Sequence, residues 1–245
     1  MTDNFIFDGR KTQKQIKDEI RRLFLAYGGN HFNNIRLVIQ NNHSFTSLFS
    51  TISIRGFFEK VTEIEINKCS HFRKFNGLEK YVNLKKLTLT SLGSISPLSL
   101  TLPDNLTKLE FLKADCLSHF DSIGVYSNLK EIDLKIPIFK ELTLPDDIRR
   151  LTNLEILNID GKFGNFPLEA LTNLKKLTLI KKRIQNPDPD LGPDPHFSSR
   201  IKGLNNLEEL KTNIILEPIV DGELTNIKLL KFFEYVSENF EKIPN

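Results

Sequence analysis

A chain of 245 residues, 39% hydrophobic and 27% charged, is long enough to bury a full core and has the composition of an ordinary soluble protein. Its net charge of +3 is too small to indicate nucleic-acid binding by itself, and no apolar run approaches the length of a membrane span. The opening residues, MTDNFIFDGR, lack the order of a signal peptide, and Cys69 and Cys116 are the only cysteines. We therefore expect a cytoplasmic protein in a reducing compartment.

The segment from Thr12 to Tyr27 predicts a helix, because apolar residues recur along it at steps of three and four. Thr12 and Gln15 fit a capping box, in which each side chain satisfies the backbone N–H of the other residue. Gly28 and Gly29 then supply a left-handed stop. We expect this helix to cover the exposed end of the core that follows.

A short pattern, L-x-x-L-x-L, then recurs along the chain. It is clearest in LTNLEILNID, residues 151–160, which returns as LTNLKKLTLI, residues 171–180. The alternating pair Leu157 and Ile159 points to one face of a strand, and Leu154 lies where the chain turns into that strand. The units from Val61 onward are Val61/Ile64/Ile66, Leu84/Leu87/Leu89, Leu106/Leu109/Phe111, Leu129/Ile132/Leu134, Leu154/Leu157/Ile159, Leu174/Leu177/Leu179, Leu207/Leu210 and Leu224/Ile227/Leu229.

The first unit is ambiguous, because Phe32/Ile35/Leu37 and Ile35/Leu37/Ile39 fit the pattern equally well. An asparagine precedes the first leucine of most units: Asn83, Asn105, Asn128, Asn153, Asn173 and Asn206. Such an amide can bond nearby backbone groups and fix the turn into the strand. We interpret these asparagines as structural and not as a binding site.

These units resemble those of the leucine-rich repeat family. The resemblance implies an α/β solenoid: a horseshoe with a curved parallel β-sheet, a mixed helical and 3₁₀ convex side, and helical caps at both ends. It implies a single domain over 1–245, with an N-terminal capping helix over 1–30, repeats over 31–229 and a C-terminal capping helix over 230–245. The asparagine or cysteine that the family places eight residues after the first leucine is matched only by Cys69, which indicates irregular repeats.

One interval breaks the period. Residues 181–203, rich in proline and aspartate, separate the unit at Leu174 from the unit at Leu207, and the prolines prevent both a helix and a central strand. We expect an extended loop that contributes an accessory binding site through Asp188, Asp190 and Asp194. These aspartates do not match a calcium-binding loop, because prolines intervene and the terminal glutamate is missing.

No motif for catalysis or for a cofactor is present, so we expect neither an enzyme nor a cofactor protein. Two pairs, Cys69 with His71 and Cys116 with His119, offer the ligand types of a zinc site. They lie two repeats apart, however, or about 10 Å in a sheet with strands about 4.8 Å apart. We therefore expect packing cysteines and no metal.

The concave face of the sheet is the predicted binding surface. Between the core leucines, the middle outward position takes Glu65, Thr88, Glu110, Asp133, Asn158, Thr178, Lys211 and Lys228 in turn. This row is acidic over the early repeats and basic at the end, with lysines and glutamates beside it. The same row also fits a merely solvated face.

The resemblance implies a scaffold or adaptor that binds a protein partner through this face, without nucleic acid, membrane or a small-molecule substrate. Two alternatives remain open at this point. The lysine-, asparagine- and isoleucine-rich composition, with only three alanines, also fits a secreted bacterial effector that imitates host repeat proteins. A constitutive structural subunit of a larger assembly would use the same fold.

Overall fold

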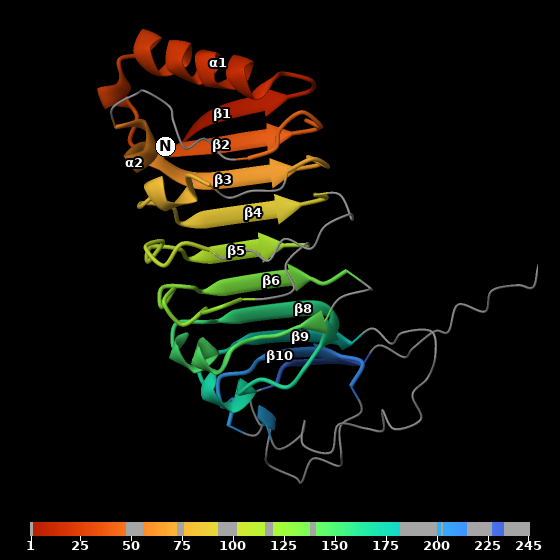
Figure 1. The fold of residues 1–245 in the computed structure, drawn as a ribbon. Helices are drawn as coiled ribbons and strands as arrows, with labels where there is room; N and C mark the ends of the chain where they lie inside the picture. The colour runs from red at the N-terminus through yellow and green to blue at the C-terminus, as the bar shows by residue number, and fades with distance from the viewer. Residues whose placement is uncertain are drawn as a thin grey trace, which may run out of the picture.

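The computed structural model describes residues 2–47, 56–72, 76–92, 102–115, 120–137, 141–181, 200–201, 203–214 and 227–232. Its strands form an eleven-stranded sheet in which all pairings between the described strands are parallel. The strands are β1 (Asp3–Asp8), β2 (Ile35–Gln40), β3 (Val61–Asn67), β4 (Lys86–Thr90), β5 (Phe111–Ala114), β6 (Glu131–Lys135), β7 (Glu141–Leu142), β8 (Ile156–Phe163), β9 (Lys176–Lys181), β10 (Glu209–Thr212) and β11 (Leu229–Phe232). Their spatial order follows the chain, except that β7 pairs only with β8 (Figure 1).

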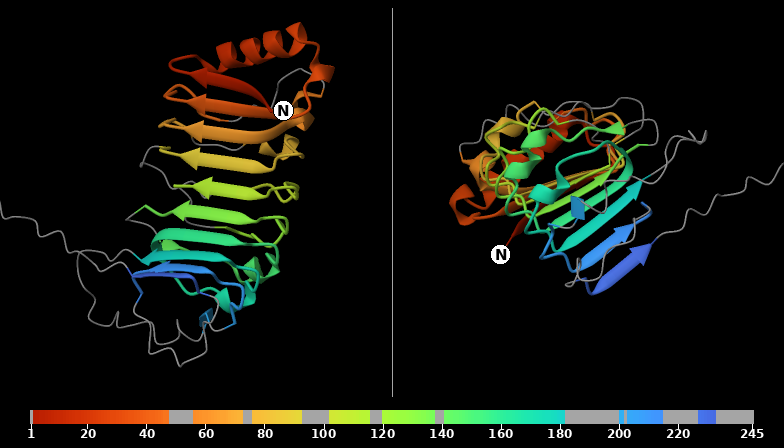
Figure 2. Two further views of the ribbon diagram at one scale, coloured as in Figure 1. Left: turned by 180° about the vertical axis from the view of Figure 1, so that it is seen from behind. Right: turned by 90° about the horizontal axis from the view of Figure 1, so that it is seen from below.

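The connections carry short helical segments. They are α2 (Phe57–Lys60) and the 3₁₀ turns η1 (Gly29–His31), η2 (Leu78–Lys80), η3 (Asp146–Arg150) and η4 (Leu168–Ala170). Seen from below in Figure 2, the strands occupy one side of the stack and the helical turns the other. A parallel strand followed by a return on one side is the unit from which a solenoid grows.

The core lies between the sheet and these connections. Along most strands the burial alternates, so that β8 buries Leu157 and Ile159 while β9 buries Leu177 and Leu179; β2 is an exception, because Val38 is buried between Leu37 and Ile39. Leu157 and Leu177 are register partners on neighbouring strands, as the sequence predicted. The turns contribute a second layer, in which Tyr81, Leu106, Tyr126, Leu151, Leu171 and Leu204 are all buried three residues before the first leucine of a repeat.

Asparagine side chains join successive repeats. Four of them donate a hydrogen bond from Nδ2 to a backbone carbonyl of the previous repeat, over 2.6–2.9 Å: Asn128, Asn153, Asn173 and Asn206. In each case the acceptor lies one residue before the position that the asparagine holds in its own repeat. Asn83 makes an equivalent bond of 2.7 Å to the carbonyl of Glu59. The sixth, Asn105, donates to the carbonyl of Glu79 at 2.6 Å, so the predicted hydrogen bonding of these amides to the backbone is confirmed.

The helix predicted over 12–27 is present as α1 (Gln13–Ala26), with both bonds of the capping box between Thr12 and Gln15. Its apolar stripe of Ile16, Ile20 and Phe24 is buried. In Figure 1 it lies beyond β1, at the N-terminal end of the stack.

Strand β1 was not predicted. Phe5 and Phe7 are buried and pair in register with Leu37 and Ile39 of β2, so the sheet begins before the helix. Assigning all of residues 1–30 to a capping helix was wrong. The missed signal was the alternation in NFIFD, which is only five residues long.

Two predicted repeats are shifted by three residues. In β5 the inward residues are Leu112 and Ala114, which are register partners of Leu87 and Leu89 on β4. Phe111 was predicted to face the core but lies on the opposite face. The observed register buries Leu106, Leu109 and Leu112 together, whereas the predicted one would have left Leu112 on the exposed face.

The last repeat shows the same shift. Leu230 pairs with Leu210, and Lys231 pairs with Lys211. A C-terminal helix beginning at residue 230 was therefore wrong, because Leu229–Phe232 is strand β11. Residues 233–245, the rest of the predicted cap, lie outside the described residues.

Candidate functional site: the open face of the sheet

We call the side of the sheet opposite the core the open face; it is the face that the sequence analysis expected to be concave. Two rows of outward side chains run across it from strand to strand. The middle row is Ile6, Val38, Glu65, Thr88, Lys113, Asp133, Asn158, Thr178, Lys211 and Lys231. The flanking row, two residues earlier on each strand, is Asn4, Arg36, Glu63, Lys86, Phe111, Glu131, Ile156, Lys176, Glu209 and Leu229.

Six of the eight predicted partner-binding residues lie in the middle row: Glu65, Thr88, Asp133, Asn158, Thr178 and Lys211. Glu110 and Lys228 do not, and assigning them to this row was wrong. Their places are taken by Lys113 and Lys231, because β5 and β11 are shifted by three residues. The middle row therefore does not change evenly from acidic to basic, and Lys113 interrupts its acidic part.

Glu110 and Lys228 instead belong to a charged ladder at the edge of the sheet where the chain enters each strand. The ladder alternates in sign from repeat to repeat: Lys85, Glu110, Lys130, Glu155, Lys175, Glu208 and Lys228. Glu110 contacts Lys85 at 3.5 Å and Lys130 at 2.8 Å, Lys175 contacts Glu155 at 2.9 Å, and Lys228 contacts Glu208 at 3.1 Å. The hydrogen bond from Lys130 holds the pKa of the Glu110 carboxyl below its ordinary value, against the opposing effect of burial.

Backbone hydrogen bonds run along the same ladder. The amide of each member from Glu110 onward donates to the carbonyl of the member before it, over 2.8–2.9 Å. The ladder is therefore part of the joint between repeats, and its charges are already matched within the chain. The ladder could be read from the sequence, because a lysine or glutamate follows the first leucine or isoleucine of each of these units, but the alternation is visible only in the corrected register.

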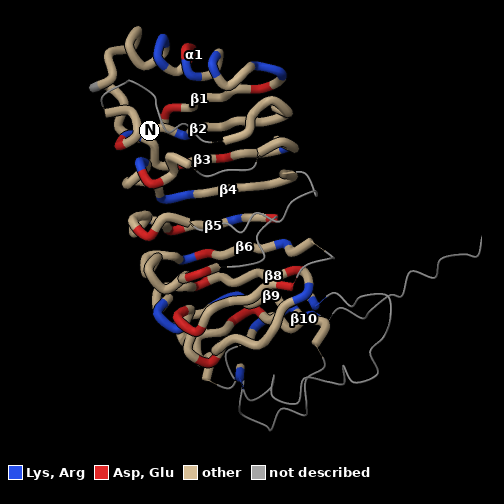
Figure 3. Tube along the Cα trace, viewed as in Figure 1, with Lys and Arg blue, Asp and Glu red and all other residues tan. Residues whose placement is uncertain are grey.

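The charges on the open face are mostly paired with one another. Arg36 contacts Glu65 at 2.6 Å and Glu63 at 3.7 Å, and Lys113 contacts Asp133 at 2.5 Å. Nearer the C-terminal end, Glu209 contacts Lys176 at 2.8 Å and Lys211 at 3.7 Å. Figure 3 shows both signs of charge distributed along the stack. The face offers no single-sign stripe across its described rows.

The centre of the face is less polar. Phe111, Glu131 and Ile156 are direct register partners on β5, β6 and β8, and all three are half-buried. The ammonium group of Lys86 lies 4.6 Å from the ring centroid of Phe111. The sequence alone did not indicate that Phe111 is a surface residue, because its position also fits the inward pattern of the predicted register.

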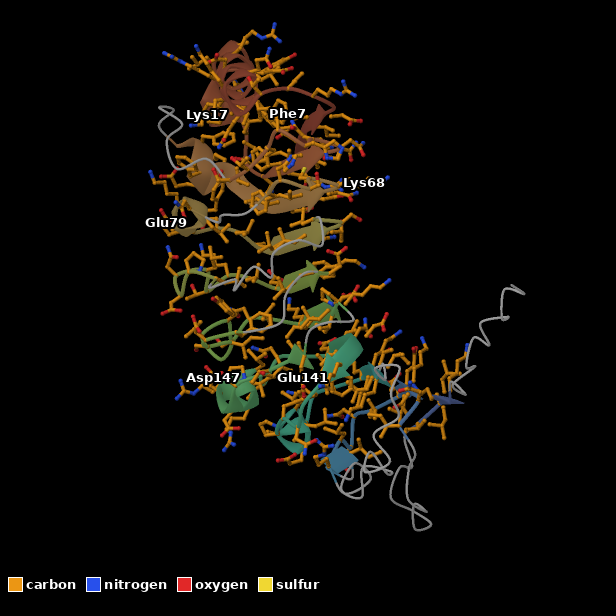
Figure 4. The ribbon with its side chains drawn as sticks, turned by 45° about the vertical axis from the view of Figure 1, so that its right-hand side comes forward. Phe7, Lys17, Lys68, Glu79, Glu141 and Asp147 are labelled. Atoms are coloured by element: carbon orange, nitrogen blue, oxygen red, sulfur yellow. The ribbon has the colours of Figure 1, made fainter. Side chains whose placement is uncertain are left out.

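The opposite side of the molecule is built from turns. Figure 4 shows Glu79 and Asp147 in the turns that precede the strands, at the opposite end of the strands from Lys68, which follows β3. The Asp147 carboxylate of η3 accepts hydrogen bonds from the Ser122 hydroxyl at 2.5 Å and from the amides of Ile123 and Gly124 at 3.2 and 3.1 Å. It therefore joins two consecutive connections and has little capacity left for a ligand.

The residues of the rejected zinc site are only partly described. Cys69 is buried, and its Sγ atom lies 3.6 Å from the carbonyl oxygen of Ile39 and 3.4 Å from that of Asn67; burial raises the pKa of its thiol. His71 is exposed, while Cys116 and His119 lie outside the described residues. The described ranges contain no cluster of three or more metal-binding side chains. Asp188, Asp190 and Asp194 of the predicted accessory loop also lie outside them.

Parallel strands in chain order, leucines at fixed inward positions, asparagine bonds from repeat to repeat and short turns on the other side define a leucine-rich repeat solenoid. Within the described ranges, no helix has the length and apolar character needed to cross a bilayer.

Solved structures with a similar fold include an internalin (InlF) from Listeria monocytogenes, 16% identical, with a TM-score of 0.45; the alignment covers 82% of this chain and 68% of the internalin. A leucine-rich repeat protein from Leptospira interrogans is 19% identical, with a TM-score of 0.41. The alignment covers 81% of this chain but only 60% of the Leptospira chain. No protein-family model matches the sequence, and no curated protein matches it.

Proposed function

We propose that the protein is an interaction scaffold that binds a protein partner on the open face of its sheet. The observation that carries this proposal is the face itself: two rows of outward side chains run across ten strands, and all of these side chains except the buried Val38 are at least partly exposed. Solenoids use such extended surfaces for binding. Six basic and five acidic residues in the two rows give a mixed field, which suits a protein surface better than a nucleic-acid backbone.

A reversible adaptor is favoured over a permanently assembled subunit. An obligate interface exposes a large apolar surface when its partner is removed. The large hydrophobic side chains that are exposed among the described residues are Ile6, Leu25, Tyr27, Val82 and Leu230. They are spread over β1, the end of α1, the turn before β4, and β11, and therefore do not form one such surface.

The test is capture of partners from the source cells with two forms of the full chain. The wild type is compared with a double variant, Asn158→Arg and Thr178→Arg, which places two long charged side chains on neighbouring strands of the middle row. Both positions are half-buried on the open face, and neither belongs to an ion pair of the open face, so the double variant should still fold. Glu169→Arg, on an exposed turn, is the control for added positive charge.

The proposal expects at least one protein that is captured by the wild type and by Glu169→Arg but lost with the double variant. An identical set of captured proteins from all three forms would overturn it. Deletion of residues 186–195 in the same assay tests the accessory loop. If the deletion abolishes capture while the double variant does not, the loop is the binding site and the open face is not.

A further inference from the structure

One carboxylate on the open face has no partner. In the two rows, Glu63, Glu65, Asp133 and Glu209 all make ion pairs within the face. Among the carboxylates of these rows that the structure describes, only that of Glu131 makes neither an ion pair nor a hydrogen bond. The lysines around it are engaged elsewhere, since Lys113 contacts Asp133 and Lys86 lies over the ring of Phe111.

Apolar side chains flank this carboxylate on both sides. Phe111 of β5 and Ile156 of β8 are its direct register partners, so their side chains stand about one strand spacing away. Burial raises the pKa of the Glu131 carboxyl, and the nearby charge of Asp133 raises it further, while Lys86 and Lys113 oppose the rise. The carboxylate has therefore lost part of its hydration without gaining a compensating hydrogen bond or ion pair. A cationic group of a partner would supply that interaction.

The chemistry of the three side chains selects the kind of cation. A divalent metal needs several oxygen ligands, and Glu131 supplies one carboxylate. A lysine ammonium group is compact and strongly hydrated, whereas a guanidinium is planar, weakly hydrated and able to bind a carboxylate through two hydrogen bonds while its flat face lies on an aromatic ring. Arginine therefore fits a carboxylate beside a half-buried phenylalanine better than lysine does.

We propose that Phe111, Glu131 and Ile156 form the central recognition site of the open face, which receives an arginine side chain of the partner protein together with apolar side chains beside it. Glu131 pairs with the guanidinium, and Phe111 and Ile156 contact its flanks. Such centres, an aromatic residue and a charge pair shielded from water, carry most of the affinity of protein interfaces. This inference rests on the proposed function, because it places the partner on the open face.

The experiment selects binders from a phage-displayed library of random short peptides on the immobilised full chain. Three forms are used: wild type, Glu131→Gln, and Glu169→Gln, which makes the same chemical change on an exposed turn. Wild type and Glu169→Gln should enrich peptides with an arginine next to apolar residues, and Glu131→Gln should not. A wild-type-selected peptide should bind Glu131→Gln at least about tenfold more weakly, as expected when one charge-assisted pair is removed.

A structural role alone would not give this result. The Glu131 carboxylate of the wild type is partly desolvated and unpaired. The melting temperature of Glu131→Gln should therefore be no lower than that of the wild type, so weaker binding cannot be due to unfolding. Replacing the arginine of the selected peptide by lysine should weaken binding to the wild type and change binding to Glu131→Gln much less. This coupling between the two substitutions is specific to a direct contact.

The outcomes separate the inference from the proposed function. Wild-type binders without arginine, no enrichment on the wild type, or arginine peptides that bind Glu131→Gln equally well would each overturn the inference. If the peptides selected on the wild type do not bind the double variant Asn158→Arg and Thr178→Arg, the open face remains the binding surface. If they bind that double variant normally, the proposed function fails together with the inference.

Discussion

Asn42 shows how a single polar residue can be structural and buried. It follows β2, at the position that corresponds to Cys69 in the next repeat, and is buried. Its Nδ2 donates to the carbonyl of Lys11 at 2.8 Å, and its Oδ1 accepts from the amide of Ser44 at 3.0 Å. Cys69 was predicted in this position from the sequence but Asn42 was not, because the first repeat had no certain register. Asn42 also begins an Asn-His-Ser sequence, and its burial leaves the amide inaccessible to modification in the folded chain.

Asn42→Ala should lower the free energy of unfolding by about 1–3 kcal/mol, because it removes both hydrogen bonds that the buried Asn42 amide makes with partly buried backbone groups, the Lys11 carbonyl and the Ser44 amide. Asn153→Ala removes a comparable bond, to the carbonyl of Ser127, at an exposed position where water replaces it, and should cost about 0.5–1 kcal/mol. Urea unfolding of both variants gives the comparison. Equal losses would mean that Asn42 is not buried as described.

Asp147 should make a pH-dependent contribution to stability. Burial alone would raise its pKa, but the bonds from Ser122, Ile123 and Gly124 outweigh that effect and the pKa is lowered. A carboxyl whose pKa is lower in the folded than in the unfolded state stabilises the fold above its ordinary value near 3.8 and loses this effect as the pH falls through the folded value. Asp147→Asn should therefore melt below the wild type at pH 7, and the gap should close below about pH 4. A gap that stays constant with pH would contradict this assignment.

At the scale of strands, the sequence predicted where most repeats lie but not the register of every one. The strands β3, β4, β6, β8, β9 and β10 have the predicted inward residues, since each segment offers only one clear alignment of its apolar residues with the repeat. The segment from Leu106 to Ala114 offers two, because leucines at 106, 109 and 112 allow either. The asparagine at 105 favoured the wrong one, and only packing against β4 and β6 distinguishes them.

The same ambiguity decided how much of the candidate site was predictable. Residues on strands of clear register, such as Asp133 and Asn158, were placed correctly on the open face. Phe111 was not, and without it Glu131 appeared as one polar residue among many. Its isolation depends on which lysines pair with which carboxylates, and this is a property of side chains from neighbouring strands that sequence spacing alone does not contain.

Alanine substitution tests the register of β5. Leu112→Ala should cost about 2–5 kcal/mol, as for other fully buried leucines. Phe111→Ala removes a larger side chain but from the open face, and should cost about 1 kcal/mol or less. Thermal and urea unfolding would measure both. The reverse ranking would restore the register in which Phe111 faces the core.

Across the whole molecule, the corrected register shows a regular alternation of repeat length. The first leucines at 84, 109, 129, 154 and 174 lie 25, 20, 25 and 20 residues apart. The charged ladder alternates with the same step, with a lysine after Leu84, Leu129 and Leu174 and a glutamate after Leu109 and Leu154. Neighbouring repeats are therefore complementary pairs, whose opposite charges meet at the edge of the sheet.

Glu110→Lys should destabilise the protein, because it places three lysines in sequence along the ladder at positions 85, 110 and 130. The midpoint of urea unfolding should fall at low salt, and the loss should shrink at about 1 M salt, where the charges are screened. Glu110→Gln is the control, with a smaller loss. A Glu110→Lys protein as stable as the wild type at low salt would mean that the ladder does not join the repeats electrostatically.

Carboxylate footprinting of the complex tests the central claim most directly. Carbodiimide coupling of an amine to the free protein and to the protein bound to its captured partner, followed by mass spectrometry, reports the accessibility of each carboxylate. The account predicts that labelling of Glu131 and Asp133 falls several-fold in the complex, while labelling of Glu79 and Glu169 on the turns stays the same. Protection of Glu79 and Glu169 with unchanged labelling of Glu131 and Asp133 would contradict it and place the partner on the opposite side of the solenoid.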